Sequence, residues 1–130
     1  MTDERDGDTN TGQDPARAGK CYSSAFEALI LLGETRGYLT PGDQYVLGTI
    51  ITDGKARREP HAWVESGDVV YDLTVTSKPW DRANFYRIAS AIAIERYGAD
   101  TVMAIGWPDL VTTILQPFHA KHMPPKATSS

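Results

Sequence analysis

Two short runs of β-forming residues, separated by a turn, most constrain the fold of this chain. Residues 61–65 and 68–74 are rich in valine, threonine and aromatic side chains, and Ser66 and Gly67 between them are typical of a tight hairpin turn. Counting outward from a two-residue loop places His61 opposite Asp72, where Cβ atoms lie about 4.5–5.5 Å apart on one face. The hairpin therefore predicts that these two side chains are neighbours. A four-residue loop keeps the pairing, whereas an odd-length loop destroys it.

A helix and a strand are predicted before the hairpin. Apolar residues recur at helical spacing over residues 21–32, so that one stripe faces a core, and Gly33 is a natural stop signal. Residues 44–52 have the β-branched and aromatic composition of a strand. Gly48 within that strand indicates a β-bulge or the close approach of another backbone, and room for a substrate is the alternative reason for its missing side chain.

The segments after the hairpin complete the prediction of the fold class. Residues 85–95 fit either a strand or a helix, and we prefer a strand after Asn84 followed by a helix from about Asp100. A last helix is expected over residues 107–118, where Pro108 suits the first turn. The order of elements predicts an α+β fold, with an N-terminal helix packed on an antiparallel sheet and helices at the C-terminus.

Composition predicts one folded domain between two flexible ends. Of the 130 residues, 41% are hydrophobic, which is ordinary for a globular protein. Residues 1–18 hold acidic and small polar side chains with almost no apolar ones, which predicts a disordered acidic leader. Residues 122–130 are expected to form a flexible tail. The remaining residues, 19–121, are enough for a domain that folds alone.

Charge and cysteine content argue against several functions. The net charge of −4 disfavours nucleic acid as a partner, because phosphate binding requires clustered lysine and arginine. No apolar run reaches the roughly 18 residues that span a membrane, and the N-terminus lacks a secretory signal pattern. The single cysteine cannot form a disulfide within the chain. We therefore expect a cytoplasmic protein without membrane or nucleic-acid partners, whose oligomeric state the sequence does not fix.

Cys21, His61 and Asp72 are the candidate catalytic residues. A carboxylate beside an imidazole binds one ring nitrogen and leaves the other to act on a thiol. Cys21 lies at the start of the predicted helix, where the helix N-terminus and a nearby imidazolium favour the thiolate and first-turn N–H groups can hold an oxyanion. We expect this helix to pack on the sheet face that carries His61, Trp63, Asp72 and Val70. The alternatives are a cysteine that serves as a small core residue and a purely structural His–Asp pair.

Trp63 and Tyr22 are the predicted substrate-binding residues. Trp63 follows His61 by two positions, so it lines the acyl site or shields the His–Asp pair, and plain packing in the core is the alternative. For Tyr22, contact with substrate is weighed against packing of the helix on the sheet. His119 and His122 have a spacing that suits a metal on a helix, but no carboxylate or cysteine adjoins them, so no cofactor is predicted.

Three short motifs resemble the transglutaminase-like branch of the papain-like cysteine protease superfamily. They are Cys21-Tyr22-Ser23-Ser24-Ala25, His61-Ala62-Trp63-Val64-Glu65 and Val70-Tyr71-Asp72-Leu73-Thr74. Small bacterial and phage-encoded proteins of this branch carry a C-Y-x-x-A, H-A-W-V-E and D-x-T pattern. Lasso-peptide leader peptidases and arylamine N-acetyltransferases share its Cys, His, Asp order. The resemblance implies a transglutaminase-like core in which Cys21 is the nucleophile, His61 the general base and acid, and Asp72 the orienting carboxylate.

The predicted activity is acyl transfer through a cysteine. The substrate is expected to be a peptide, protein or small molecule with an amide or thioester bond, which fits a hydrolase, peptidase, deamidase or transglutaminase-like enzyme. One alternative is an inactive binding or accessory protein on the same fold, in which Cys21 is not selectively alkylated. Another is a mononuclear metal site of Cys21, His61 and Asp72, which metal analysis detects. The sequence does not identify the substrate, and a phage origin is implied by the resemblance alone.

Overall fold

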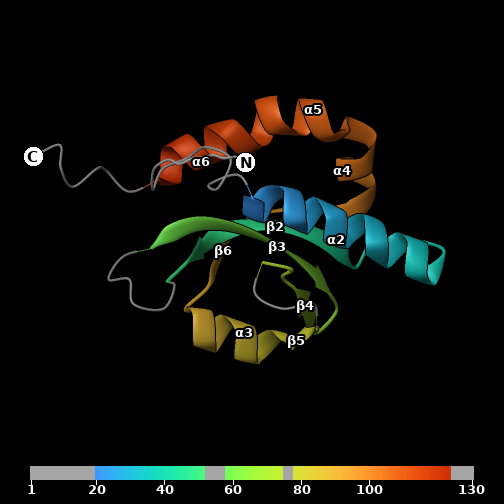
Figure 1. The fold of residues 1–130 in the computed structure, drawn as a ribbon, viewed down its shortest axis with the longest axis horizontal. Coiled ribbons are helices and arrows are strands. Elements are labelled where there is room, and N and C mark those ends of the chain that lie inside the picture. The colour runs from blue at the N-terminus through green and yellow to red at the C-terminus, as the bar shows by residue number, and fades with distance from the viewer. Residues whose placement is uncertain (1–19, 52–57, 75–77, 124–130) are drawn as a thin grey trace, which may run out of the picture.

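A five-stranded antiparallel sheet forms the middle of the fold (Figure 1). The computed structural model describes residues 20–51, 58–74 and 78–123. The predicted leader, residues 1–18, lies outside these ranges, as does most of the predicted tail, residues 122–130. In their order across the sheet, the strands are β5 (Trp80–Asp81), β4 (Val69–Tyr71), β3 (Glu59–Ser66), β2 (Asp43–Ile50) and β6 (Ile92–Gly98).

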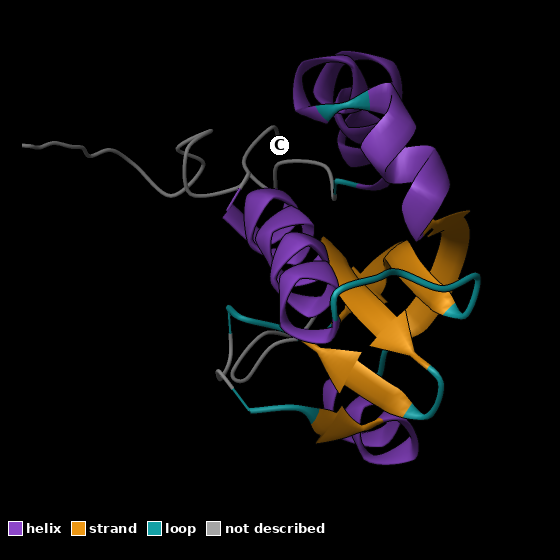
Figure 2. Ribbon diagram, turned by 90° about the vertical axis from the view of Figure 1, so that its right-hand side faces the viewer, coloured by secondary structure: helices purple, strands orange, loops and turns teal. Residues whose placement is uncertain are grey.

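Helices cover both faces of this sheet. α2 (Lys20–Arg36) and the C-terminal helices lie on one face, and α3 (Arg82–Ala89) lies on the other (Figure 1 and Figure 2). The C-terminal segment consists of α4 (Ala99–Ile105), α5 (Trp107–Leu110), the π-helical segment η2 (Val111–Leu115) and α6 (Gln116–His122). This arrangement confirms the α+β class that the order of the predicted elements indicated.

The two faces of β3 are buried against different helices. Ala62 and Val64 belong to the cluster under α2, whereas Trp63 packs with Val70 and with Phe85 of α3. The expectation that the N-terminal helix packs on the face of Trp63 and Val70 is therefore wrong. Six consecutive residues of β3 are buried, so both of its faces lie in the interior. Burial on both faces does not indicate which of them the helix covers.

The turn between β3 and β4 lies one residue later than predicted. Ser66 pairs with Val69, so Gly67 and Asp68 are the two loop residues, and Gly67 has a φ of 60°. A glycine adopts this left-handed conformation without the steric cost that a side chain imposes. The prediction that Ser66 belongs to the loop is wrong.

Moving the turn by one residue changes which residues of β3 and β4 pair, but not which side chains share one face of the hairpin. The ladder between β3 and β4 reaches only from the turn to the pair Val64 and Tyr71, so the direct opposition of His61 and Asp72 is not observed. A one-residue shift of a two-residue loop moves the register by two positions, and two positions restore the same face of a strand. His61 and Asp72 therefore still lie on one side of the hairpin.

α2 is longer than its sequence pattern indicated. The helix passes through Gly33 and ends at Arg36, before Gly37 with a φ of 87°, so the stop predicted at Gly33 is wrong. A Cβ on Gly33 would lie 3.1 Å from Cγ of Leu39. This glycine therefore gives room for the chain that returns along the helix, rather than a cap.

Asp43 joins the end of α2 to the central strands. Its side chain is fully buried and accepts hydrogen bonds from the Arg36 guanidinium, from the Thr40 backbone N–H at 2.7 Å and from Ser66 Oγ at 2.7 Å. These hydrogen bonds outweigh the effect of burial and lower the pKa of the Asp43 carboxyl. One carboxylate thus fixes a helix end, a loop and a strand end together.

The segment after β5 is a helix followed by a strand. α3 occupies the first half of the ambiguous residues 85–95, so the strand preferred directly after Asn84 is wrong there, and β6 forms the second half. The helix begins because the Asp81 side chain accepts from the Asn84 N–H at 3.1 Å, and it ends at Ser90, which has a φ of 50°. The helix expected from about Asp100 is confirmed as α4.

The last predicted helix is confirmed and extended. Helical structure runs from Trp107 through α5, η2 and α6 to His122, beyond the expected end at residue 118. Pro108 stands in the first turn of α5, as predicted.

Gly48 provides both features that its position in a strand indicated. The register between β2 and β6 shifts between Leu47 and Gly48, which is a β-bulge or a comparable irregularity. A Cβ on Gly48 would lie 2.0 Å from the Ile92 carbonyl oxygen and 2.8 Å from Cη2 of Trp63. The missing side chain therefore accommodates a neighbouring backbone and an indole ring.

We expect Gly48→Ala to lower the free energy of unfolding by about 1–3 kcal/mol or more, because the added methyl group overpacks a rigid contact. Urea denaturation monitored by circular dichroism measures this change. Gly42→Ala is the matched control, since its Cβ meets only Thr40 Oγ1 at 3.6 Å, and its expected effect is within about 0.5 kcal/mol. Equal stability of the two variants would contradict the packing described for Gly48.

Candidate functional site

The structure joins His61 and Asp72 by a hydrogen bond. Nε2 of His61, in β3, lies 2.7 Å from Oδ2 of Asp72, which directly follows β4. Both residues are buried, with 8% and 2% of their surface exposed. A short hydrogen bond between buried groups holds the imidazole in one orientation and fixes which nitrogen faces the carboxylate.

Asp72 is itself held by the residue two positions further on. Its Oδ1 accepts from the Thr74 backbone N–H at 3.1 Å and from Thr74 Oγ1 at 2.5 Å, which leaves Oδ2 to His61. Burial alone raises the pKa of this carboxyl, but the hydrogen bonds of His61 and Thr74 outweigh it and lower the pKa of Asp72. The Asp-x-Thr pattern marks such a turn in the sequence, although the role of Thr74 was not predicted.

Cys21 completes the group from the first turn of α2. Its side chain is hydrogen-bonded with that of His61, and 8% of the residue surface is exposed. Because Nε2 of His61 faces Asp72, Nδ1 is the ring nitrogen that remains for the thiol. The structure thus brings together all three predicted catalytic residues.

The meeting of Cys21 and His61 does not require that α2 cover the His61 face. The β3–β4 ladder starts at the turn and ends at Val64, three positions before His61 is reached. Among the described residues, no paired strand therefore flanks His61 on the β4 side. Within the described residues, the imidazole thus lies beside a stretch of β3 that β4 does not pair, close to the N-terminal end of α2.

The charge state of His61 depends on both neighbours. Burial alone favours the neutral ring, but hydrogen bonds with Asp72 and Cys21 outweigh it and raise the pKa of His61 from 6.5 to about 9. The imidazolium is therefore the dominant form at neutral pH. Such a ring can give a proton to a leaving group and stabilise an anionic sulfur beside it.

Tyr22 is buried next to this site and bonded to a histidine of α6. Its hydroxyl lies 2.7 Å from Nδ1 of His119, and its carbonyl oxygen accepts from the Tyr45 hydroxyl at 2.7 Å. Burial and the nearby Cys21 side chain raise the pKa of both phenols, whereas burial lowers the pKa of His119. Sequence reasoning missed the contact between Tyr22 and His119, because no local pattern joins residues 97 positions apart.

Trp63 is fully buried beside His61. Their ring centroids are 6.1 Å apart with an angle of 30° between the planes, and Phe85 packs on the indole at 5.2 Å. Contact of Trp63 or Tyr22 with substrate stays a prediction. The complete burial of Trp63 in the apolar cluster of the α3 face fits two of the roles that the sequence offered, shielding of the His61–Asp72 pair and plain packing in the core.

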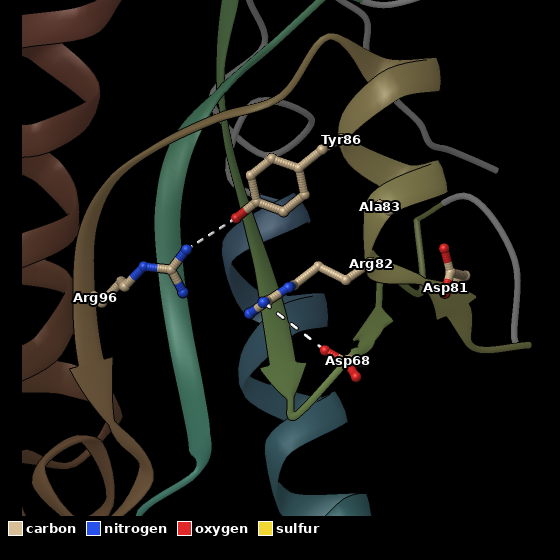
Figure 3. A pocket seen from close by; sticks show the side chains of 6 residues that line it. All are labelled: Asp68, Asp81, Arg82, Ala83, Tyr86 and Arg96. Carbon is tan, nitrogen blue, oxygen red and sulfur yellow. Dashed lines mark hydrogen bonds and ion pairs between the residues drawn. The ribbon is translucent and has the colours of Figure 1, made fainter.

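A polar hollow of about 550 Å³ opens near the α3 face. Figure 3 shows Tyr86 of α3 pointing toward Arg96 of β6, with Arg82 reaching to Asp68. Asp81 and Ala83 also line the hollow. Each guanidinium lies beside a carboxylate of the protein: Arg96 and Arg82 both approach Glu65, at 2.6 and 3.5 Å. The charges around this hollow are thus largely balanced within the chain.

Comparison of the chain with protein-family models, with curated proteins and with solved structures gave no match. The resemblance to transglutaminase-like proteins therefore rests on the three motifs. Across the described ranges, no three or more His, Cys, Asp or Glu side chains are grouped so that they could hold a metal ion. In the same part of the chain, no helix has the length and apolar character needed to cross a membrane.

We expect the imidazole of His61 to titrate near pH 9, and that of His119 below 6.5. Proton NMR of the ring signals measures both in one sample, so that His119 serves as an internal control. Asp72→Asn removes the carboxylate that stabilises the imidazolium, and the midpoint of His61 should fall toward or below 6.5. A midpoint of His61 that is unchanged by Asp72→Asn would contradict this account of the pair.

Proposed function

We propose that this protein is a cysteine-dependent acyl-transfer enzyme that acts on an amide or thioester bond. The observation that carries the proposal is the position of His61, whose ring lies between the Cys21 side chain and the Asp72 carboxylate. A nucleophile, a base in contact with it and a group that orients the base are the parts that covalent catalysis requires. The motif resemblance adds support of a second kind.

In the proposed acylation step, Cys21 attacks the carbonyl carbon of the substrate as the thiolate, with the proton held on His61. An electron pair of Sγ forms the new S–C bond, and the carbonyl π pair moves onto oxygen. The N–H groups of a helix's first turn have no partner within the helix, and we assign the oxyanion to this turn of α2. When the intermediate collapses, the bond to the leaving nitrogen or sulfur breaks, and that atom takes the proton of His61.

In the proposed second step, water or an amine attacks the acyl-enzyme thioester. His61, now neutral, accepts the proton of the attacking group at Nδ1, and the C–S bond breaks with its electron pair returning to Sγ. Water yields a carboxylic acid, and an amine yields a new amide. Asp72 keeps Nε2 engaged throughout, so that Nδ1 remains aligned with the reacting atoms.

The reactivity of Cys21 toward iodoacetamide tests the proposal without a known substrate. The chain has a single cysteine, so mass spectrometry of the intact protein reports this one thiol. At pH 7 we expect native Cys21 to react about tenfold faster than the same thiol in urea-unfolded protein, because an imidazolium favours the thiolate. His61→Gln should reduce the native rate to the unfolded rate or below it.

His122→Gln is the matched control, because this histidine packs on Phe118 in α6 and has no part in the proposed chemistry. Its alkylation rate should equal that of the unmodified chain. If His61→Gln and His122→Gln both leave the rate unchanged, Cys21 is not activated by His61, and the protein is better described as an inactive member of its fold. Once a substrate is found, Cys21→Ala should abolish turnover and leave the circular dichroism spectrum intact.

A further inference from the structure

The indole of Trp63 is held in one orientation on several sides. Its Nε1–H donates to Oε2 of Glu65 at 2.9 Å, and the Tyr86 ring meets it edge-on at 6.0 Å. Gly48 leaves the space that Cη2 of the indole occupies. The indole therefore cannot turn within its pocket without losing a buried hydrogen bond.

Glu65 holds this orientation from a buried position at the end of β3. Only 2% of its surface is exposed, and a buried carboxylate is costly unless donors surround it. Besides Trp63, it accepts a hydrogen bond from the Tyr86 hydroxyl and one from Arg96 Nη1 at 2.6 Å. These hydrogen bonds outweigh the effect of burial and lower the pKa of the Glu65 carboxyl.

Three elements meet at this carboxylate. Tyr86 comes from α3 and Arg96 from β6, and Figure 3 shows their side chains converging. The α3 face already has an apolar cluster of Val46, Ile50, Trp63, Val70 and Phe85. A buried ion pair is not needed to close such a cluster, since apolar residues of similar volume often serve equally well. What the carboxylate adds is a directional acceptor for the indole N–H.

We propose that Glu65 is a positioning residue for the Cys21–His61 pair, and that it acts through Trp63. The proposal rests on the proposed function. The indole lies two positions from His61 on the same strand face, and its ring centroid is 6.1 Å from that of the imidazole. A fixed indole keeps water away from the side of the imidazole next to it, and hydrogen bonds of the imidazole are stronger where water is excluded. An indole that is free to move should therefore weaken the hydrogen bonds that the charged His61 ring makes with Asp72 and Cys21.

Glu65→Gln tests this role, because it keeps the shape of the side chain and removes its charge. We expect the NMR titration midpoint of His61 to fall by at least about half a pH unit and the alkylation rate of Cys21 at pH 7 to fall about three- to tenfold. Val102→Ala is the control: it removes buried methyl groups from α4 and leaves the polar contacts of Glu65 intact. Its midpoint and rate should not change.

The outcomes separate a positioning role from a structural one. If Glu65→Gln lowers stability as Val102→Ala does, with the His61 midpoint and the Cys21 rate unchanged, the proposal is overturned. If Glu65→Gln does not fold, Tyr86→Phe decides, because it removes one donor to Glu65 at a half-buried position. A smaller shift of the same sign supports the proposal, and an unchanged midpoint overturns it.

The same data distinguish this proposal from the proposed function. If alkylation of Cys21 in the unmodified chain does not depend on His61, the proposed function fails first. If that dependence is present and only the Glu65 and Tyr86 variants lack an effect, the positioning role fails alone.

Discussion

Burial of carboxylates is the constraint on which the rest of this structure depends. Asp43, Glu65 and Asp72 are each at most 2% exposed, and each stands at or just beyond the end of a strand. A charge in such a place must be matched by donors. The cation nearest Asp43 is Arg36, and that nearest Glu65 is Arg96, neither of which loses its charge. Asp72 is matched by His61, which can lose its proton, so this pair alone among the three is suited to proton transfer.

The sequence predicted the hairpin more securely than its register. Residues 66–68, Ser-Gly-Asp, allow a two-residue loop at either of two positions with Gly67 inside it, and the observed pairing of Ser66 with Val69 is what distinguishes them. Because the period of a strand is two, this error left His61 and Asp72 on one face. The short distance between them was thus predictable, whereas their direct opposition was not. The hydrogen bonds from Thr74 to Asp72 agree with the local Asp-x-Thr pattern, so this contact could have been predicted.

Features that depend on distant contacts could not be predicted in this way. Six consecutive residues of β3 are buried, and the large indole of Trp63 suits packing as well as Ala62 and Val64 do, so burial alone did not indicate which of these faces α2 covers. The acceptor role of Glu65 depends on side chains from α3 and β6, 21 and 31 residues further along the chain. In the segment after β5, the capping signal of Asp81 was present, but alternating alanines obscured it.

The two supports of the His61 charge suggest how one imidazole can serve both halves of the proposed reaction. The pKa of His61 is raised by its hydrogen bonds with Asp72 and with Cys21. Acylation turns Cys21 into a neutral thioester, which removes the second support and leaves the first. The pKa of His61 should then fall toward neutral pH, because Asp72 alone remains to offset the effect of burial. The imidazolium that protonated the leaving group thus becomes a base for the incoming water or amine, without any movement of Asp72.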